Sequence, residues 1–336
     1  MAKTLIGVDI GTNAVKMAVC AGGRVLQTAA QTLPENMVSG GRIVSPDSMA
    51  QFLREMRKNH HISARDAAVV LPETDVFCRR LTLPAMTEEQ LRLNLPYEFR
   101  DYIAHEKEKY FYDYAVVDVI DDETGTPVSL DLMAAAVLKS TIADYFQLFK
   151  RAGMRLKVAI PMEMAYANLL AAYERAHPAQ EGEAPREYCL LDLGHTAMRT
   201  HVYTGSAFEV TKVMDIGGAL LDEAIAEHFH VDEHIARTYK LSNYQDAQEL
   251  DSCVSLYSTV AIEIMKAINF YRYNKPETEI ADAYYFGGGA HIDSLITAVS
   301  ATIGLHMQPI DALLPHVEKG APDTLLCALA IGAAQQ

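Results

Sequence analysis

The sequence predicts an α/β protein made of two similar halves, and three observations point to this fold class. Short apolar runs typical of strands alternate with segments of helical periodicity along 336 residues. The stretch VDIGTNAVKMAV near the start has a counterpart, LDLGHTAMRTHV, beginning at Leu191. A chain of this length exceeds the size of one typical domain. We therefore expect a duplicated domain, with one half at residues 1–187 and the other at residues 188–336.

The composition excludes several classes of partner. The formal net charge is -15, from 44 acidic and 29 basic residues, and no basic run is present. Such a surface repels nucleic acid and anionic lipid, so we expect no nucleic-acid partner and membrane association only through other proteins. The five cysteines form no CxxC pair and fit reduced core thiols. Asp9 interrupts the first apolar stretch and no apolar run reaches 18 residues, so we expect a cytoplasmic protein.

The first half begins with a β-hairpin and a third strand at residues 22–33. A helix is predicted from Pro46, with Ser45 as its N-cap, and a buried strand at residues 66–72. Residues 73–153 read as strand, helix, strand, strand and helix, which predicts a subdomain inserted in the first half. Pro96 should kink or split the first helix of this insertion, and the acidic turn at residues 121–127 should close a hairpin.

The second half follows HPAQEGEAPRE (residues 177–187), a polar segment rich in Pro and Glu that is the best linker candidate. After it the hairpin plan returns, followed by a helix (ALLDEAIAEHFH) and a second short helical segment. A long amphipathic helix is predicted at residues 251–273 and a closing Ala-rich helix after Pro322.

The two hairpin turns have the chemistry of a phosphate site. Glycines at positions 11 and 194 let backbone N–H groups approach anionic oxygens, and the nearby threonines can donate hydrogen bonds. Two carboxylates, Asp9 and Asp192, cannot face a polyphosphate without a divalent cation. Mg2+ fits because it keeps part of its water shell.

Two further glycine clusters each precede a helix. The pair Gly217–Gly218 opens ALLDEAIA, and FGGGA at residues 286–290 follows a strand, as suits close approach of a nucleotide. A single D-x-G turn is more often an ordinary hairpin, and a single GGG is more often a tight turn. The order of all four motifs favours a nucleotide cleft.

These motifs together resemble the superfamily of actin, heat-shock chaperones and sugar kinases. VDIGTNAVK is similar to its first phosphate motif, LDLGHTAMR to the second, and YYFGGGA to its adenosine motif. Within that superfamily the whole chain resembles the PilM family of type IV pilus assembly, which is related to the division protein FtsA. GVDIGTNAVK, RRLTLPAMTEEQL, DIGGALLDEAIA, EIMKAINFYR and APDTLLCALAIGAA carry this resemblance.

The resemblance implies an actin-like ATPase fold, in which duplicated ribonuclease H-like domains flank the nucleotide and a subdomain is inserted in the first. It implies a cytoplasmic scaffold that binds ATP and Mg2+ and docks the N-terminal peptide of a PilN-like inner-membrane protein, with other pilus components nearby. Asp9 and Asp192 are the expected metal-side carboxylates. The expected nucleotide-binding residues are Asp9, Gly11, Thr12, Asn13, Lys16, Asp192, Gly194, His195, Thr196, Gly217, Gly218, Lys240, Gly287, Gly288 and Gly289.

Two departures from the superfamily pattern bear on catalysis. Ile160, Pro161 and Met162 stand where an acid that positions the attacking water is expected, and Glu163 is the nearest carboxylate. Arg237 occupies a position on the adenine-side helix where an acid is more usual. ATP hydrolysis is therefore expected to be weak or absent, and no catalytic residue is assigned.

Other functions remain open at this point. An FtsA-like or plasmid-segregation filament protein shares the motifs, as do a sugar or acetate kinase and a chaperone-like microcompartment protein. His228, His230 and His234 fit a solvated helix end better than a zinc site. The aromatic run at residues 110–114 fits either packing against a helix or a peptide-binding face.

Overall fold

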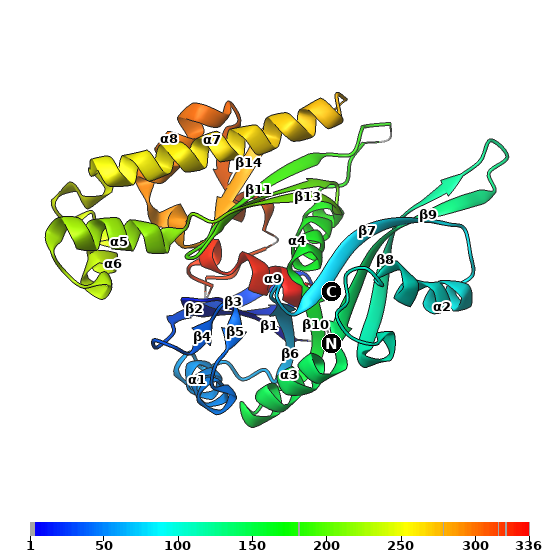
Figure 1. Cartoon of the computed structure of the whole chain (residues 1–336), viewed down its shortest axis with the longest axis horizontal. Helices are drawn as coiled ribbons and strands as arrows, with labels where there is room; N and C mark the ends of the chain where they lie inside the picture. The colour runs from blue at the N-terminus through cyan, green and yellow to red at the C-terminus, as the bar shows by residue number, and fades with distance from the viewer. Residues whose placement is uncertain (1–3, 181, 278, 315, 320, 336) are drawn as a thin grey trace. The chain divides into compact units, whose positions relative to one another are not determined.

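The computed structural model describes residues 4–180, 182–277, 279–314, 316–319 and 321–335. The chain divides into two compact units (Figure 1). Unit 1 comprises Met1–Leu169, His316–Pro322 and Leu329–Gln336, and unit 2 comprises Leu170–Pro315 and Asp323–Ala328. The change of unit lies inside helix α4 (Met162–Ala176), ahead of the boundary predicted at residue 187.

Unit 1 is built on a five-stranded sheet with the order β10-β6-β1-β2-β3. The first three strands in sequence form an antiparallel meander, and the other two join the sheet parallel to β1. Its strands are β1 (Leu5–Ile10), β2 (Ala14–Ala21), β3 (Arg24–Thr32), β6 (Asp66–Leu71) and β10 (Arg155–Pro161). A two-stranded ribbon, β4 (Val38–Ser39) and β5 (Arg42–Ile43), precedes the first helix.

Helices α1 (Pro46–Asn59) and α3 (Lys139–Arg151) contribute to the core of this sheet. The Ser45 side chain accepts a hydrogen bond from the Ser48 N–H, and Pro46 takes the first helical position, as the sequence predicted. Met49, Leu53 and Met56 recur at helical spacing and are fully buried. The inward face of α1 therefore follows directly from its apolar periodicity.

The closing helix α9 (Ala328–Ala334) belongs largely to unit 1 because its backbone approaches β1 very closely. A Cβ atom at Gly7 would lie 1.7 Å from the carbonyl oxygen of Ala330, and one at Gly332 would lie 2.1 Å from that of Ala165. Only small residues allow such contacts. The predicted second half, 188–336, thus includes a C-terminal segment that packs in unit 1.

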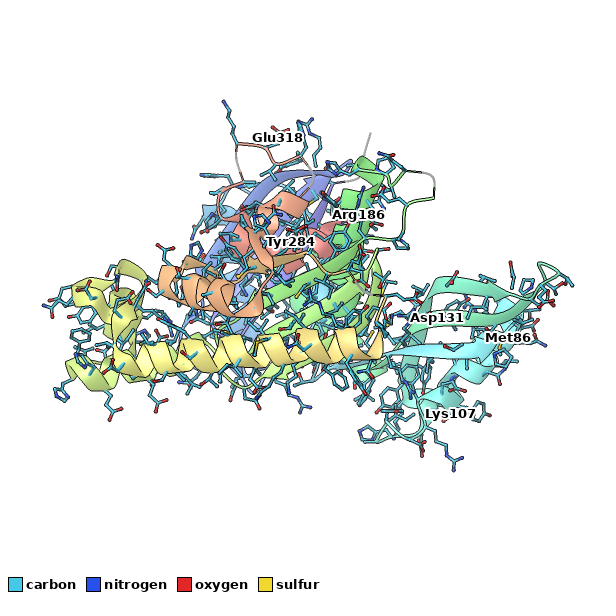
Figure 2. All side chains as sticks on the ribbon, turned by 90° about the horizontal axis from the view of Figure 1, so that it is seen from above. Met86, Lys107, Asp131, Arg186, Tyr284 and Glu318 are labelled. Atoms are coloured by element: carbon cyan, nitrogen blue, oxygen red, sulfur yellow. The ribbon has the colours of Figure 1, made fainter. Side chains whose placement is uncertain are left out.

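The insertion has its own three-stranded antiparallel sheet, ordered β7-β9-β8, and a small core. Its elements are β7 (Val76–Pro84), α2 (Glu88–Glu98), η1 (Lys107–Lys109), β8 (Tyr110–Asp121) and β9 (Pro127–Leu138). Figure 2 shows Asp131 and Met86 on the insertion, with Lys107 before β8. The last helix of the predicted 73–153 block, α3, packs instead with the core of the unit 1 sheet, so the compact insertion ends near Leu138.

Helix α2 begins at a local capping signal and continues past its proline. Thr87 and Gln90 form a reciprocal capping box at the start of the helix. The helix runs through Pro96 to Glu98, so the split expected at Pro96 does not occur, although the proline removes one backbone donor from the last turns. The buried Phe99 then anchors the chain in the insertion core.

Unit 2 repeats the plan of unit 1 with a five-stranded sheet ordered β13-β12-β11-β14-β15. Its strands are β11 (Glu187–Leu193), β12 (Met198–Thr204), β13 (Ala207–Met214), β14 (Asp282–Phe286) and β15 (His306–Pro309). Its helices are α5 (Gly218–Phe229), α6 (Glu233–Ser242), η2 (Tyr244–Glu249), α7 (Asp251–Asn274), η3 (Gly288–His291), α8 (Asp293–Ile303), η4 (Ile310–Leu313) and η5 (Thr324–Leu326). The polar segment predicted as a linker is a connection within unit 2, and its residue 181 lies outside the described residues.

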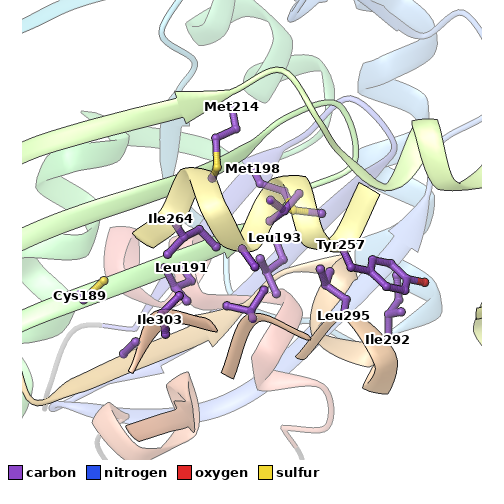
Figure 3. Close-up of a cluster of buried hydrophobic side chains, with 14 of the residues drawn as sticks. Cys189, Leu191, Leu193, Met198, Met214, Tyr257, Ile264, Ile292, Leu295 and Ile303 are labelled. Carbon is purple, nitrogen blue, oxygen red and sulfur yellow. The ribbon is translucent and has the colours of Figure 1, made fainter. Parts of the chain in front are cut away.

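The core of unit 2 forms between the sheet and helices α7 and α8 (Figure 3). Leu191, Tyr257, Ile264 and Leu295 are at most 2% exposed within it. Among the described residues, α7 is the one helix long and apolar enough to cross a membrane by length and composition. Its buried face packs in this core, as expected of a core helix of amphipathic pattern.

His201 on β12 makes the stability of unit 2 sensitive to acid. Burial, with a smaller contribution from Arg199, lowers the pKa of His201 from 6.5 to about 3. Below pH 6.5 the unfolded chain therefore binds a proton that the folded chain excludes, and stability from this residue is lost as pH falls toward 3. We expect the free energy of unfolding to fall by about 1.4 kcal/mol per pH unit in that window through this residue alone.

Urea unfolding of the wild type, His201→Gln and the exposed control His228→Gln at pH 7 and pH 5 checks this expectation. The pH dependence should be shallower for His201→Gln and unchanged for the control. Parallel pH dependences for all three proteins would contradict it.

Candidate functional site: the glycine turns and a buried carboxylate

The first hairpin turn, in unit 1, holds the five residues predicted there in one short segment. Asp9 and Lys16 are direct partners across β1 and β2, and the Lys16 ammonium lies 3.0 Å from the Asp9 carboxylate. The Gly11 N–H donates to the Ala14 carbonyl at 3.0 Å and closes the turn. Lys16 thus supplies a positive charge beside the acid and the glycine.

The outer part of this turn is tied to the neighbouring strand. The carbonyl of Asn13 accepts a hydrogen bond from the Leu33 N–H at 2.9 Å. Thr12 lies between Gly11 and Asn13 and is partly exposed. The turn is therefore fixed in shape while its hydroxyl-bearing residue remains accessible.

The second hairpin turn, in unit 2, is held against the start of α5. The N–H groups of Gly218 and Ala219 donate to the carbonyls of Gly194 and His195, at 3.0 and 2.8 Å. A Cβ atom at Gly217 would lie 2.3 Å from the His195 carbonyl oxygen. The close packing of this turn against the start of α5 explains why residue 217 is glycine. Two of the N–H groups at the start of the helix are already bonded to the turn.

The glycine triplet after β14 lies beside the second hairpin. Gly287 has a φ of +91°, and a Cβ atom there would lie 3.1 Å from a carboxylate oxygen of Asp192. A Cβ atom at Gly289 would lie 2.8 Å from the Leu193 side chain. Gly288 differs, because a Cβ atom there meets nothing within 4 Å. Packing explains the glycines at 287 and 289, whereas the glycine at 288 borders open space.

A buried carboxylate that the sequence reasoning missed lies next to the second hairpin turn. Asp222 of α5 has no exposed surface, and the Lys240 ammonium lies 2.6 Å from its Oδ1 atom. The Arg237 Nε atom donates to Oδ2 at 3.3 Å, and the His195 ring nitrogen lies 4.0 Å away. The available signal was an acid placed between Leu221 and Ile225, on the apolar face of a predicted helix.

Lys240 is committed to this cluster. Its ammonium also donates to the Gly218 carbonyl at 2.8 Å, and its side chain is 7% exposed. Burial lowers the pKa of Lys240, whereas the neighbouring Asp222 raises it. In this arrangement Lys240 fixes the start of α5, and its contact with a base or ribose stays a prediction.

The acidic residues at the turns do not form a complete set of metal ligands by themselves. Across the described ranges, no group of three His, Cys, Asp or Glu residues is placed to hold a metal ion, and this covers the three histidines at positions 228, 230 and 234. Each turn offers a single carboxylate, Asp9 in unit 1 and Asp192 in unit 2, so water and phosphate oxygens would have to supply most of the coordination shell of a bound Mg2+.

Glu163 lies in the first turn of α4. Burial raises the pKa of the Cys78 thiol on β7, and the negative charge of Glu163 raises it further. No catalytic residue is assigned.

Two sheets of one strand order, each opening on a hairpin with an acid and a glycine at its turn, define an actin-like ATPase fold. The family model of the type IV pilus assembly protein PilM matches residues 7–317. The chain therefore belongs to the PilM family.

Solved structures support the same fold. The chain is similar to a chain of the PilM-PilN type IV pilus biogenesis complex, with a TM-score of 0.80, 21% identity and coverage of 98% of this chain and 97% of that one. The ethanolamine utilization protein EutJ from Carboxydothermus hydrogenoformans follows at a TM-score of 0.59, 15% identity and coverage of 99% and 89%. The chain is also similar to MreB5 of Spiroplasma citri bound to ADP, with a TM-score of 0.51, 11% identity and coverage of 98% of this chain and 94% of that one. No curated protein sequence matches the chain.

Removing the charge of Asp222 should destabilise unit 2. Asp222→Asn keeps the side-chain shape but leaves the cations of Lys240 and Arg237 without their buried counter-charge. We expect a loss of about 3–5 kcal/mol in the free energy of unfolding, as for other buried pairs broken from one side.

Urea unfolding of Asp222→Asn, the double variant Asp222→Asn with Lys240→Met, and the exposed neighbour control Glu223→Gln measures this loss. The double variant should recover part of the loss because it removes the unpaired cation. Equal stabilities of Asp222→Asn and Glu223→Gln would refute the role of the cluster.

Proposed function

We propose that this protein is a nucleotide-binding PilM-type scaffold that docks the N-terminal cytoplasmic peptide of a PilN-like inner-membrane protein. The observation that carries the proposal is the family match over residues 7–317 together with the fold shared with the PilM-PilN complex over nearly the whole chain. The acidic surface fits a protein on the cytoplasmic side that reaches the membrane through its partner.

The proposed ligand is ATP with Mg2+. In unit 1 the turn at Asp9, Gly11 and Thr12 offers a carboxylate, a close backbone approach and a hydroxyl, beside the charge of Lys16. In unit 2 the corresponding set is Asp192, Gly194, His195 and Thr196, next to Gly217 and Gly218 and to the glycines at 287–289. Mg2+ supplies charge neutralisation for the phosphates, with Asp9 and Asp192 holding its water shell.

Gly288 gives the nucleotide proposal its most direct structural support. Its two neighbours are glycines for packing reasons, but Gly288 borders open space, where a side chain would be tolerated by the fold. A glycine without a packing reason fits a position that a ligand approaches closely. Asp222 and Lys240 then act as positioning residues that fix the helix start beside this ligand.

The PilN-like peptide is proposed to bind between the insertion and the first sheet of unit 1. Strand β7 is one edge of the insertion sheet, and β10 is one edge of the unit 1 sheet. Edge strands carry backbone groups that an extended peptide can bond, and side-chain pockets beside them give specificity. Phe77 on β7 is 41% exposed and is the proposed apolar contact.

The proposed role is scaffolding rather than turnover. Strand β10 ends in Ile160 and Pro161, Met162 begins α4, and Glu163 follows in the first turn of that helix. A general base must reach the attacking water, and no residue is assigned that role. ATP is therefore proposed as a ligand that sets the affinity for the peptide.

The nucleotide proposal predicts a selective effect of Gly288→Val. Calorimetry with ATP and Mg2+ should show binding to the wild type and at least about tenfold weaker binding to Gly288→Val, because the added methyl groups occupy the ligand's space. The unfolding midpoint should not change. Asp9→Asn and Asp192→Asn should weaken binding more with Mg2+ than with EDTA.

The exposed-helix variant Ala143→Val serves as the control for added bulk in this experiment. Absence of heat when ATP is added to the wild type would rule out the nucleotide proposal. Retained affinity in Gly288→Val would remove the glycine turn from the site.

The peptide proposal predicts a different pattern among surface variants. A labelled synthetic N-terminal peptide of the PilN-like protein encoded beside this gene should bind, with an affinity that differs between ATP-loaded and nucleotide-free protein. Phe77→Ser should weaken binding at least about fivefold, as loss of an apolar contact does, whereas Leu93→Ser on α2 should not.

Fluorescence anisotropy measures both effects. Equal peptide affinity with and without ATP would reject coupling between the two ligands. Pelleting of filaments in ATP, with no peptide binding, would instead favour the FtsA-like function.

A further inference from the structure

The β8–β9 hairpin of the insertion ends in an extended two-stranded ribbon (Figure 1). Its far end carries exposed valines that are not part of the insertion core. We call residues 116–131 the distal arm. Val116 pairs with Leu132 and Val119 with Leu130, so both valines share the face that α2 covers further along the sheet. Val116, Val119 and Val128 are 52%, 44% and 47% exposed. They continue the apolar face of the insertion, with side chains that remain exposed.

The hairpin is also uniformly acidic. Residues 110–138 contain six Asp or Glu and no Lys, Arg or His. Asp131 is neutralised within the fold, because the Arg80 guanidinium donates to both of its oxygens at 2.9 and 3.0 Å through Nε. The other five acids are exposed, namely Asp113, Asp118, Asp121, Asp122 and Glu123.

Strand β8 forms the open edge of this sheet, opposite β7. Natural edge strands are commonly protected by Lys or Pro, and β8 has neither. Instead, the N–H groups of Tyr114 and Val119 donate to the carboxylates of Asp113 and Asp118, at 2.9 and 2.8 Å. These acids thus occupy edge N–H groups that another strand would otherwise bond.

The two faces of the edge differ in chemistry. Asp118 pairs with Asp131, while the next residue, Val119, pairs with Leu130, so this acid and this valine point to opposite faces. Ile120, 41% exposed, shares the face of Asp118. A strand added along β8 would present its own side chains alternately to these faces. The edge therefore matches a segment in which apolar and positively charged residues alternate.

We propose that the distal arm is a docking site for an extended basic segment of a partner protein, which adds to β8 as a fourth strand. Its apolar side chains cover Val116, Val119 and Val128, and its Lys or Arg side chains pair with Asp118 and the acids at the tip. Its carbonyl groups take over the N–H groups of Tyr114 and Val119, which releases Asp113 and Asp118 to bind its cations. This site lies on the opposite edge of the sheet from β7 and is independent of the proposed nucleotide.

Charge decides between this occupant and two others. A second copy of the chain would place its own five exposed hairpin acids against the five acids of the first copy, and the two copies would repel each other because each carries a net charge of -15. An anionic membrane surface would meet the same repulsion. A basic segment gains from the charges that disfavour both alternatives.

The test uses three fluorescein-labelled peptides of one length. The first alternates Lys with Val, the second alternates Glu with Val, and the third is the Lys peptide with every second backbone nitrogen methylated. We expect the Lys peptide to bind at least about tenfold more tightly than either of the others at low salt, since it alone has both the charge and the strand edge. Hydrogen exchange should become slower in residues 110–121.

Variants locate the site. The triple variant Asp118→Asn, Asp121→Asn and Glu123→Gln should weaken the Lys peptide by about tenfold, in line with loss of complementary charge. The matched control Glu89→Gln, Asp101→Asn and Asp144→Asn makes the same charge change elsewhere in unit 1 and should have little effect. Val119→Thr keeps the side-chain shape and should weaken binding about threefold through its added hydroxyl.

Three results would overturn the proposal. If the triple variant and its matched control lose equal affinity for the Lys peptide, the peptide is attracted by the net charge of the protein alone. Equal binding of the N-methylated peptide would exclude strand addition. If hydrogen exchange in β8 becomes slower as the protein concentration is raised, without any peptide, the distal arm would be assigned to self-association.

Discussion

The contact between the second hairpin turn and the start of α5 is the constraint on which the candidate site of unit 2 depends. Two backbone hydrogen bonds, from Gly218 to Gly194 and from Ala219 to His195, join the two elements. The Lys240 ammonium links the Gly218 carbonyl to the fully buried Asp222. A buried charge persists only when it is paired, so this ion pair and the glycines beside it depend on one another.

The same fold plan places similar chemistry at the first hairpin of each unit. Each unit has a five-stranded sheet in equivalent order, and each ends its first strand with an acid before a glycine turn. In unit 1 Asp9 is the cross-strand partner of Lys16, and in unit 2 Asp192 is the cross-strand partner of Arg199. The two hairpins thus share the register of an acid opposite a basic residue, and in unit 2 Asp192 also lies beside Gly287.

The insertion adds two strand edges to the part of the molecule that carries it. Its small core of Leu81, Leu95, Phe99 and Leu132 covers only part of the β8–β9 hairpin. Beyond that core, valines and acids remain exposed on a strand edge that is protected by carboxylates rather than by lysine. Such edges can join protein partners by strand addition, which uses backbone groups for bonding and alternate side chains for specificity.

Local sequence determined most of the secondary structure and the family. The hairpin repeat, the Ser45 cap and the long helix after Asp251 follow from spacing, capping and turn chemistry, which act within a few residues. Tertiary structure decided which distant residues meet. The pairing of Asp222 with Lys240, the return of α9 to Gly7, the packing of α3 with the first sheet and the open space at Gly288 all depend on contacts between segments far apart in the chain. Such contacts leave no periodic signal in one sequence, because they arise from burial and close approach rather than from local conformation.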